Sequence, residues 1–77
     1  MAQLSAAEYD LLERAIVDGK RVAVYRRGTE YVVIALALRI EGSREVIDSR
    51  HPTTGDALRF FIDELDTIQI IPDGLQA

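Results

Sequence analysis

The clearest hydrophobic pattern in the chain lies in residues 30–40, Glu-Tyr-Val-Val-Ile-Ala-Leu-Ala-Leu-Arg-Ile, which contain neither glycine nor proline. The even positions are all large and aliphatic, whereas the odd positions change from bulky through small to charged. Successive side chains of a strand point to opposite faces, so this period of two predicts a long strand with one continuously apolar face. We expect that face, which includes Ile34 and Leu36, to line the core. The small residues in the middle should let the strand bend around a small barrel.

A helical pattern precedes this strand. Ser5 and Glu8 have the spacing of a capping box, in which each side chain bonds a backbone N–H at the helix start. Gly19 can adopt the left-handed conformation that ends a helix. Between them, apolar residues recur at helical spacing, which predicts an amphipathic helix over residues 6–17. The polar side of this helix should carry an acidic outer face made of Asp10, Glu13, Arg14 and Asp18.

Shorter alternating runs predict four further strands, at residues 20–27, 44–49, 57–63 and 67–71. The run at 44–49 has only two apolar residues, Val46 and Ile47, so we expect it at an edge of the sheet or in a partly exposed position. Residues 63–66 are too few for an α-helix and predict a one-turn 3₁₀ link.

One helix followed by five antiparallel strands predicts a mainly β fold, an Sm-like or SH3-like small barrel that occupies residues 1–77 as a single domain. The expected core consists of Leu12, Ile16, Val22, Val24, Ile34, Leu36, Phe60, Ile62 and Ile68.

Composition limits how such a domain can be stabilised. Of its 77 residues, 48% are hydrophobic but only 6% are aromatic, and none is cysteine. The core must therefore be mainly aliphatic, without disulfides or thiolate metal sites. Weak self-association through edge strands would help such a small core. No apolar stretch is long enough for a membrane helix and no signal-peptide pattern is present, so we expect a cytoplasmic protein.

The net charge of −4 is unevenly distributed. Residues 1–19 and 51–77 are acidic, whereas residues 20–50 contain seven basic side chains against four acidic ones. An acidic total disfavours general nucleic-acid binding, which needs a basic surface to displace counterions. It is compatible with a basic protein partner.

Residues with catalytic or metal-binding chemistry are few. His51 is the only histidine, without the serine or cysteine partners of a nucleophilic site, and one histidine provides too few metal ligands. The acids Asp63, Glu64 and Asp66 do not have the spacing of a calcium loop and are typical of a capping turn. The sequence therefore predicts no catalytic residue, metal or other cofactor, and a protein that is not an enzyme.

The strands are rich in arginine. Arginine suits phosphates and carboxylates alike, and we expect these side chains mainly to pair with acids on neighbouring strands. The alternative is an anion or nucleic-acid contact, for which Arg26, Arg27 and Arg39 are the candidates.

Two segments resemble a known family. Residues 8–15, Glu-Tyr-Asp-Leu-Leu-Glu-Arg-Ala, are similar to the helix of the Rof family, small Sm-like inhibitors of the Rho transcription terminator. Residues 58–68 resemble the "Arg-x-Leu-Asp-x-Ile" strand and turn of that family. The resemblance implies that an acidic surface including the helix occupies the RNA-binding site of Rho. Asp10 and Glu13 would be the matching acids, with Arg14 beside them in the partner-binding surface.

A weaker resemblance is to the WYL domain, also Sm-like, in residues 12–16, Arg21-Val22 and residues 60–68. Arg44-Glu45-Val46-Ile47 stands where the Trp-Tyr-Leu of that domain would be. This resemblance implies a regulatory module that senses a ligand or nucleic acid through its arginines. An Sm-like homo-oligomeric assembly is a third hypothesis.

Overall fold

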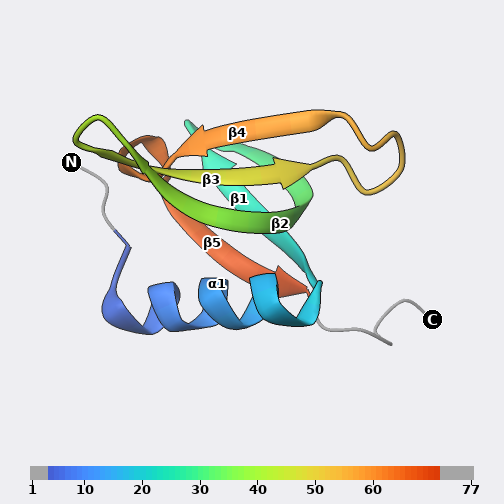
Figure 1. The fold of residues 1–77 in the computed structure, drawn as a ribbon, viewed down its shortest axis with the longest axis horizontal. Coiled ribbons are helices and arrows are strands. Elements are labelled where there is room, and N and C mark those ends of the chain that lie inside the picture. The colour runs from blue at the N-terminus through green and yellow to red at the C-terminus, as the bar shows by residue number, and fades with distance from the viewer. Residues whose placement is uncertain (1–3, 72–77) are drawn as a thin grey trace.

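The computed structural model describes residues 4–71, which form one helix and a five-stranded antiparallel sheet (Figure 1). The elements follow in the order α1 (Ala6–Asp18), β1 (Arg21–Arg26), β2 (Thr29–Glu41), β3 (Arg44–Arg50), β4 (Ala57–Phe61), the 3₁₀ turn η1 (Ile62–Glu64) and β5 (Thr67–Ile71). The strand order in the sheet is β4-β3-β2-β1-β5. This arrangement confirms the mainly β, small barrel-like fold. The fourth strand ends two residues earlier than expected, because η1 begins at Ile62.

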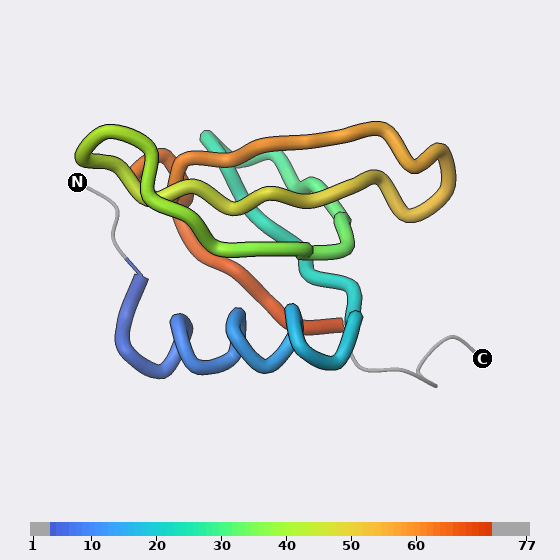
Figure 2. Tube along the Cα trace, in the orientation of Figure 1, coloured from blue at the N-terminus to red at the C-terminus, as the bar shows by residue number. Residues whose placement is uncertain are grey.

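Strand β2 gives the sheet its curvature. Its first half pairs with β1, its second half pairs with β3, and Ile34 lies in register with both neighbours. The β2–β3 register shifts between Ala35 and Ala37, so Leu36 is an extra residue without a counterpart on β3. Such a bulge bends the strand and increases its twist. The bend in β2 is visible in Figure 2, where the strand turns back across the molecule above α1.

The bulge also corrects the expected face of β2. Val33 and Ala35 are buried in the core, whereas Leu36 is 50% exposed and Ile34 is only partly buried, outside the core cluster. The expectation that Ile34 and Leu36 line the core is therefore wrong. Because β1 directs Val22 inward and Val22 lies opposite Val33, the odd positions of β2 must face inward up to the bulge. Beyond it the parity reverses, and Leu38 packs against the core.

The third strand is partly exposed, which is one of the two expected placements, but it is not an edge strand. β3 lies inside the sheet between β2 and β4, and the edge strands are β4 and β5. Its polar residues are accommodated by specific partners: Asp48 pairs with arginines, and the buried Ser49 hydroxyl donates to the Leu58 carbonyl at 3.0 Å. The low apolar content of β3 does not make it an edge strand, because its polar side chains find hydrogen-bond and ion-pair partners within the sheet.

Helix α1 covers the concave face of the sheet. Leu12 and Ala15 are buried against it, and Ile16 is partly buried there. The remaining members of the core come from every strand and from the link between β4 and β5: Val22, Val24, Val33, Ala35, Ile47, Phe60, Ile62, Leu65 and Ile68, with Leu4 at the start of the chain. Burial of this aliphatic set is the main force that holds helix and sheet together.

The face assignment of β2 predicts a difference between two truncations. Val33→Ala should lower the free energy of unfolding by about 1–3 kcal/mol, because Val33 is fully buried and the change leaves a cavity. Leu36→Ala removes a larger but half-exposed side chain and should change it by no more than about 0.5 kcal/mol. Urea denaturation of both variants measures the difference. A larger loss for Leu36→Ala than for Val33→Ala would contradict the observed register.

Candidate protein-interaction surface

The outer face of α1 brings together the side chains that the sequence predicted as a partner-binding surface. Asp10, Glu13 and Arg14 lie with Val17 and Asp18 around a shallow concavity on the side of the helix away from the sheet. All five are exposed because Leu12 and Ala15 direct the opposite side of the helix into the core. We call these five residues the helix surface.

The carboxylates of the helix surface have no partner among the residues that the structure describes. Within residues 4–71, no hydrogen bond or ion pair engages the side chain of Asp10, Glu13 or Asp18. Several other acids are held by an arginine, a backbone N–H group or a tyrosine hydroxyl, as Asp48, Asp63, Asp66 and Glu45 are. The three carboxylates are therefore available to a molecule that approaches the helix from solvent.

Both ends of α1 are fixed by local interactions. The Ser5 hydroxyl accepts from the Glu8 N–H at 3.2 Å, and the Ser5 N–H donates to Glu8 Oε1 at 2.8 Å, which completes the predicted capping box. The bond from the Ser5 backbone lowers the pKa of Glu8, helped by the Thr67 hydroxyl. Gly19 ends the helix with a φ of 70°, the left-handed conformation expected there.

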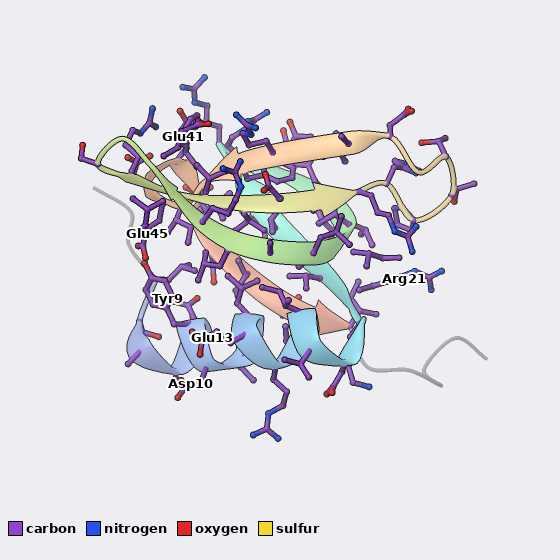
Figure 3. The ribbon with its side chains drawn as sticks, in the orientation of Figure 1. Tyr9, Asp10, Glu13, Arg21, Glu41 and Glu45 are labelled. Atoms are coloured by element: carbon purple, nitrogen blue, oxygen red, sulfur yellow. The ribbon has the colours of Figure 1, made fainter. Side chains whose placement is uncertain are left out.

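Two side-chain contacts fix α1 against the sheet. The Thr67 hydroxyl of β5 donates to Glu8 Oε2 at 2.8 Å, and on the other side of the helix the Tyr9 hydroxyl donates to Glu45 of β3. Figure 3 shows Tyr9 reaching from the helix toward Glu45, with Asp10 and Glu13 along the same helix. The bond to the carboxylate raises the pKa of Tyr9 to about 12. These contacts set the orientation in which the helix surface faces solvent.

The three arginines predicted as candidate anion contacts do not converge on one place. Arg26 lies over the rings of Tyr31 and Phe60, at 5.2 and 5.4 Å from their centroids, and its guanidinium is 3.9 Å from Glu64. Arg39 forms a bidentate pair with Asp48 on the outer face of the sheet. Arg27 occupies the β1–β2 turn with a φ of 53° and is exposed.

Pairing of the strand arginines with acids is confirmed for Arg39, Arg44 and Arg59. Arg44 binds Asp63 at 2.7 Å and Glu64 at 3.2 Å, and its guanidinium lies 3.7 Å from the Phe61 ring centroid. The Arg44 contact lowers the pKa of Asp63. Arg59 likewise contacts Glu41 at 3.1 Å.

The other polar residues singled out by the sequence support turns. His51 Nδ1 accepts from the backbone N–H groups of Thr53 and Thr54 at 3.1 and 3.2 Å, so the ring organises its own loop. Asp66 accepts from the Gly28 N–H at 3.2 Å and thereby joins the β1–β2 turn to the start of β5. Over residues 4–71, no three histidine or acidic side chains are grouped in a way that could hold a metal ion.

Arg21 and Arg50 are not among the predicted site residues, and the expected pairing of strand arginines with acids does not hold for Arg50 within residues 4–71. Both are exposed, and across the described chain neither side chain has a hydrogen bond or an ion pair. Ile34 of β2 is the register partner of both: Arg21 pairs with it from β1, and Arg50 pairs with it from β3. No local signal marks them, because only the cross-strand register determines which arginines reach an acid.

No helix in residues 4–71 combines the length and apolar character needed to cross a membrane. A scan against models of known protein families gives no match to this chain, and a search of curated proteins gives none either.

The Tyr9–Glu45 bond predicts a pH dependence on the alkaline side. Because the folded state raises the pKa of Tyr9 to about 12, the stabilisation is complete below the unfolded pKa of about 10. It is lost as the pH rises from about 10 to about 12. Tyr9→Phe should lower the free energy of unfolding by about 0.5–1.5 kcal/mol at neutral pH. The free energy of unfolding of this variant should then fall less steeply above about pH 10 than that of the unmodified protein.

Urea denaturation at a series of pH values measures this dependence, with Tyr25→Phe as a control that removes an exposed hydroxyl bound by Glu30. The control should retain most of the alkaline decline. An unchanged decline in Tyr9→Phe would show that another group causes it.

Proposed function

We propose that this protein is a non-enzymatic regulator that binds a basic protein partner through the helix surface, and that the partner is the RNA-binding face of a transcription termination factor such as Rho. In this proposal the protein modulates termination by competing with RNA for that face. Asp10 and Glu13 supply the contacts, and Arg14 lies beside them.

One observation carries the proposal: the exposed carboxylates of the helix surface have no partner within residues 4–71 while the helix that presents them is rigidly held. Acids presented on a fixed element lose little conformational freedom when they bind. A field of one sign also attracts a partner of the opposite sign and accelerates its association. An RNA-binding face is basic and therefore has the required chemistry.

The resemblance of residues 8–15 and 58–68 to the Rof family supports this partner class. The non-enzymatic part of the proposal rests on the roles of the polar groups. His51 organises its own loop, and Asp63 and Glu64 neutralise Arg44. These groups serve structural contacts and are not assembled around a common cavity.

A WYL-like anion site has less support. Of its three candidate arginines, Arg26 is stacked on two rings and Arg39 is paired with Asp48, which leaves Arg27 as the one without an internal contact in the described chain. A single arginine on a turn provides little for phosphate recognition, which uses several converging donors. We keep this alternative as an outcome of the test below.

Reversal of the two acids should abolish the interaction. The variant D10K/E13K should bind purified Rho at least tenfold more weakly than the unmodified protein, while its midpoint of thermal unfolding stays nearly unchanged because both side chains are exposed. Binding of the unmodified protein should also weaken when salt increases, since screening shortens the range of charge attraction to about 10 Å at 0.1 M. Fluorescence anisotropy with labelled protein at two salt concentrations measures both effects.

The matched control is E30K/D56K, which makes the same change in net charge at two exposed acids that lie on β2 and in the β3–β4 loop, away from α1. It should retain most of the affinity for Rho. Single-stranded RNA is the second ligand in the assay. RNA binding that survives D10K/E13K, together with no binding to Rho, would reject the proposal and favour an arginine site on the strands.

A further inference from the structure

The outer face of β2 presents an unusual row of aliphatic side chains. Val32 and Ile34 alternate with core residues and so point away from the core, and Leu36 follows them at the bulge with 50% of its surface exposed. Helix α1 covers the opposite face of the sheet. Within residues 4–71, no element packs over this row, although it belongs to the most hydrophobic stretch of the chain.

Two arginines flank the row. Arg21 on β1 and Arg50 on β3 are the register partners of Ile34 on its two sides, so all three side chains share the outer face. Two strand spacings separate the arginines at the backbone, about 10 Å. In the described chain both lack an acidic partner, unlike Arg26, Arg39, Arg44 and Arg59. We call Arg21, Val32, Ile34, Leu36 and Arg50 the sheet surface.

The helix surface is complementary to the sheet surface in charge and in size. It offers three carboxylates against one arginine, and Val17, next to Asp18 at the C-terminal end of this surface, has 83% of its surface exposed. Asp10 and Asp18 are separated by about 12 Å along the helix axis, at 1.5 Å per residue, which is close to the spacing of the two sheet arginines. The helix surface points away from its own sheet, so it can reach only the sheet surface of another molecule.

We propose that the protein self-associates by docking the helix surface of one copy on the sheet surface of a second copy. Val17 then contacts Ile34 and Leu36, and the carboxylates of the helix pair with Arg21 and Arg50. The two contacting surfaces are different, so the contact is heterologous and each added copy leaves a helix surface and a sheet surface unoccupied. This proposal does not depend on the identity of the partner proposed above. It adds that self-association and partner binding use the same helix and exclude each other.

A nucleic acid is a less suitable occupant of the sheet surface. Single-stranded nucleic acids use aromatic rings as stacking platforms. On this outer face, the Phe61 ring is covered by the Arg44 guanidinium, and the Tyr25 hydroxyl is held by Glu30 at 2.9 Å. The exposed part of the sheet surface between its arginines is aliphatic, which suits a side chain such as Val17.

The experiment uses two neutralised variants of the whole chain. R21Q/R50Q removes the charges of the sheet surface, and D10N/E13Q/D18N removes the carboxylates of the helix surface. Sedimentation velocity at low salt, across a concentration series, should show a rising average mass for the unmodified protein. Each variant alone should remain near the monomer mass of 8.6 kDa over that series.

The decisive measurement is the mixture of the two variants. R21Q/R50Q retains an intact helix surface and D10N/E13Q/D18N retains an intact sheet surface, so together they should form a 1:1 heterodimer that does not grow further. Arg27→Gln, a neutralisation of another exposed arginine outside the sheet surface, should self-associate like the unmodified protein. At concentrations where the unmodified protein is monomeric, R21Q/R50Q should bind Rho with the same affinity, which separates this test from that of the proposed function.

Four results would overturn the proposal. The unmodified protein could remain monomeric throughout the series, or R21Q/R50Q could self-associate as strongly as the unmodified protein. A mixture that stays monomeric, or a monomeric protein that binds a single-stranded RNA oligonucleotide through Arg21 and Arg50, would assign the sheet surface to a different ligand.

Discussion

The rest of the structure depends on the register of β2 with its two neighbours. Val33 lies opposite Val22 and Tyr31 lies opposite Val24, so the inward residues of β1 fix which residues of β2 enter the core. A slip of one residue would turn every one of these side chains to the other face. The extra residue at Leu36 then allows the second half of β2 to pair with β3 at a different angle. The resulting curvature creates the concave face on which α1 packs.

The same register determines which acidic and basic side chains lie next to one another. Asp48 lies opposite Arg59 on β4 and binds Arg39 as well, and Asp63 and Glu64 at η1 meet Arg44. These pairs are exposed and each contributes little to the free energy of unfolding. Their more important consequence is that they occupy acids that would otherwise be available to the remaining arginines of the strands. The carboxylates of the helix surface and the arginines at positions 21 and 50 remain without internal partners in residues 4–71, on separate surfaces of opposite charge.

The sequence alone predicted correctly those features that depend on interactions between residues close together in the chain. The capping box at Ser5 and Glu8 and the left-handed Gly19 bound the helix as expected, because each involves residues close in the chain. The exposure of Asp10, Glu13 and Arg14 followed from the helical period, since a helix with one strongly apolar side has only one way to face a core. The fold class followed from the order of helix, strands and glycine-containing turns.

Tertiary structure decided which face of residues 30–40 lies inside and which arginines are left unpaired. Both faces of that stretch are apolar in its first half, so alternation predicted the strand but could not choose between Ile34 and Val33 for the core. The choice was made by Val22 and Val24 on the neighbouring strand and by a bulge that no residue pattern marks. Arg21 and Arg50 differ from Arg39 only in what the sheet places beside them, a property of pairing between distant segments and not of the arginines themselves.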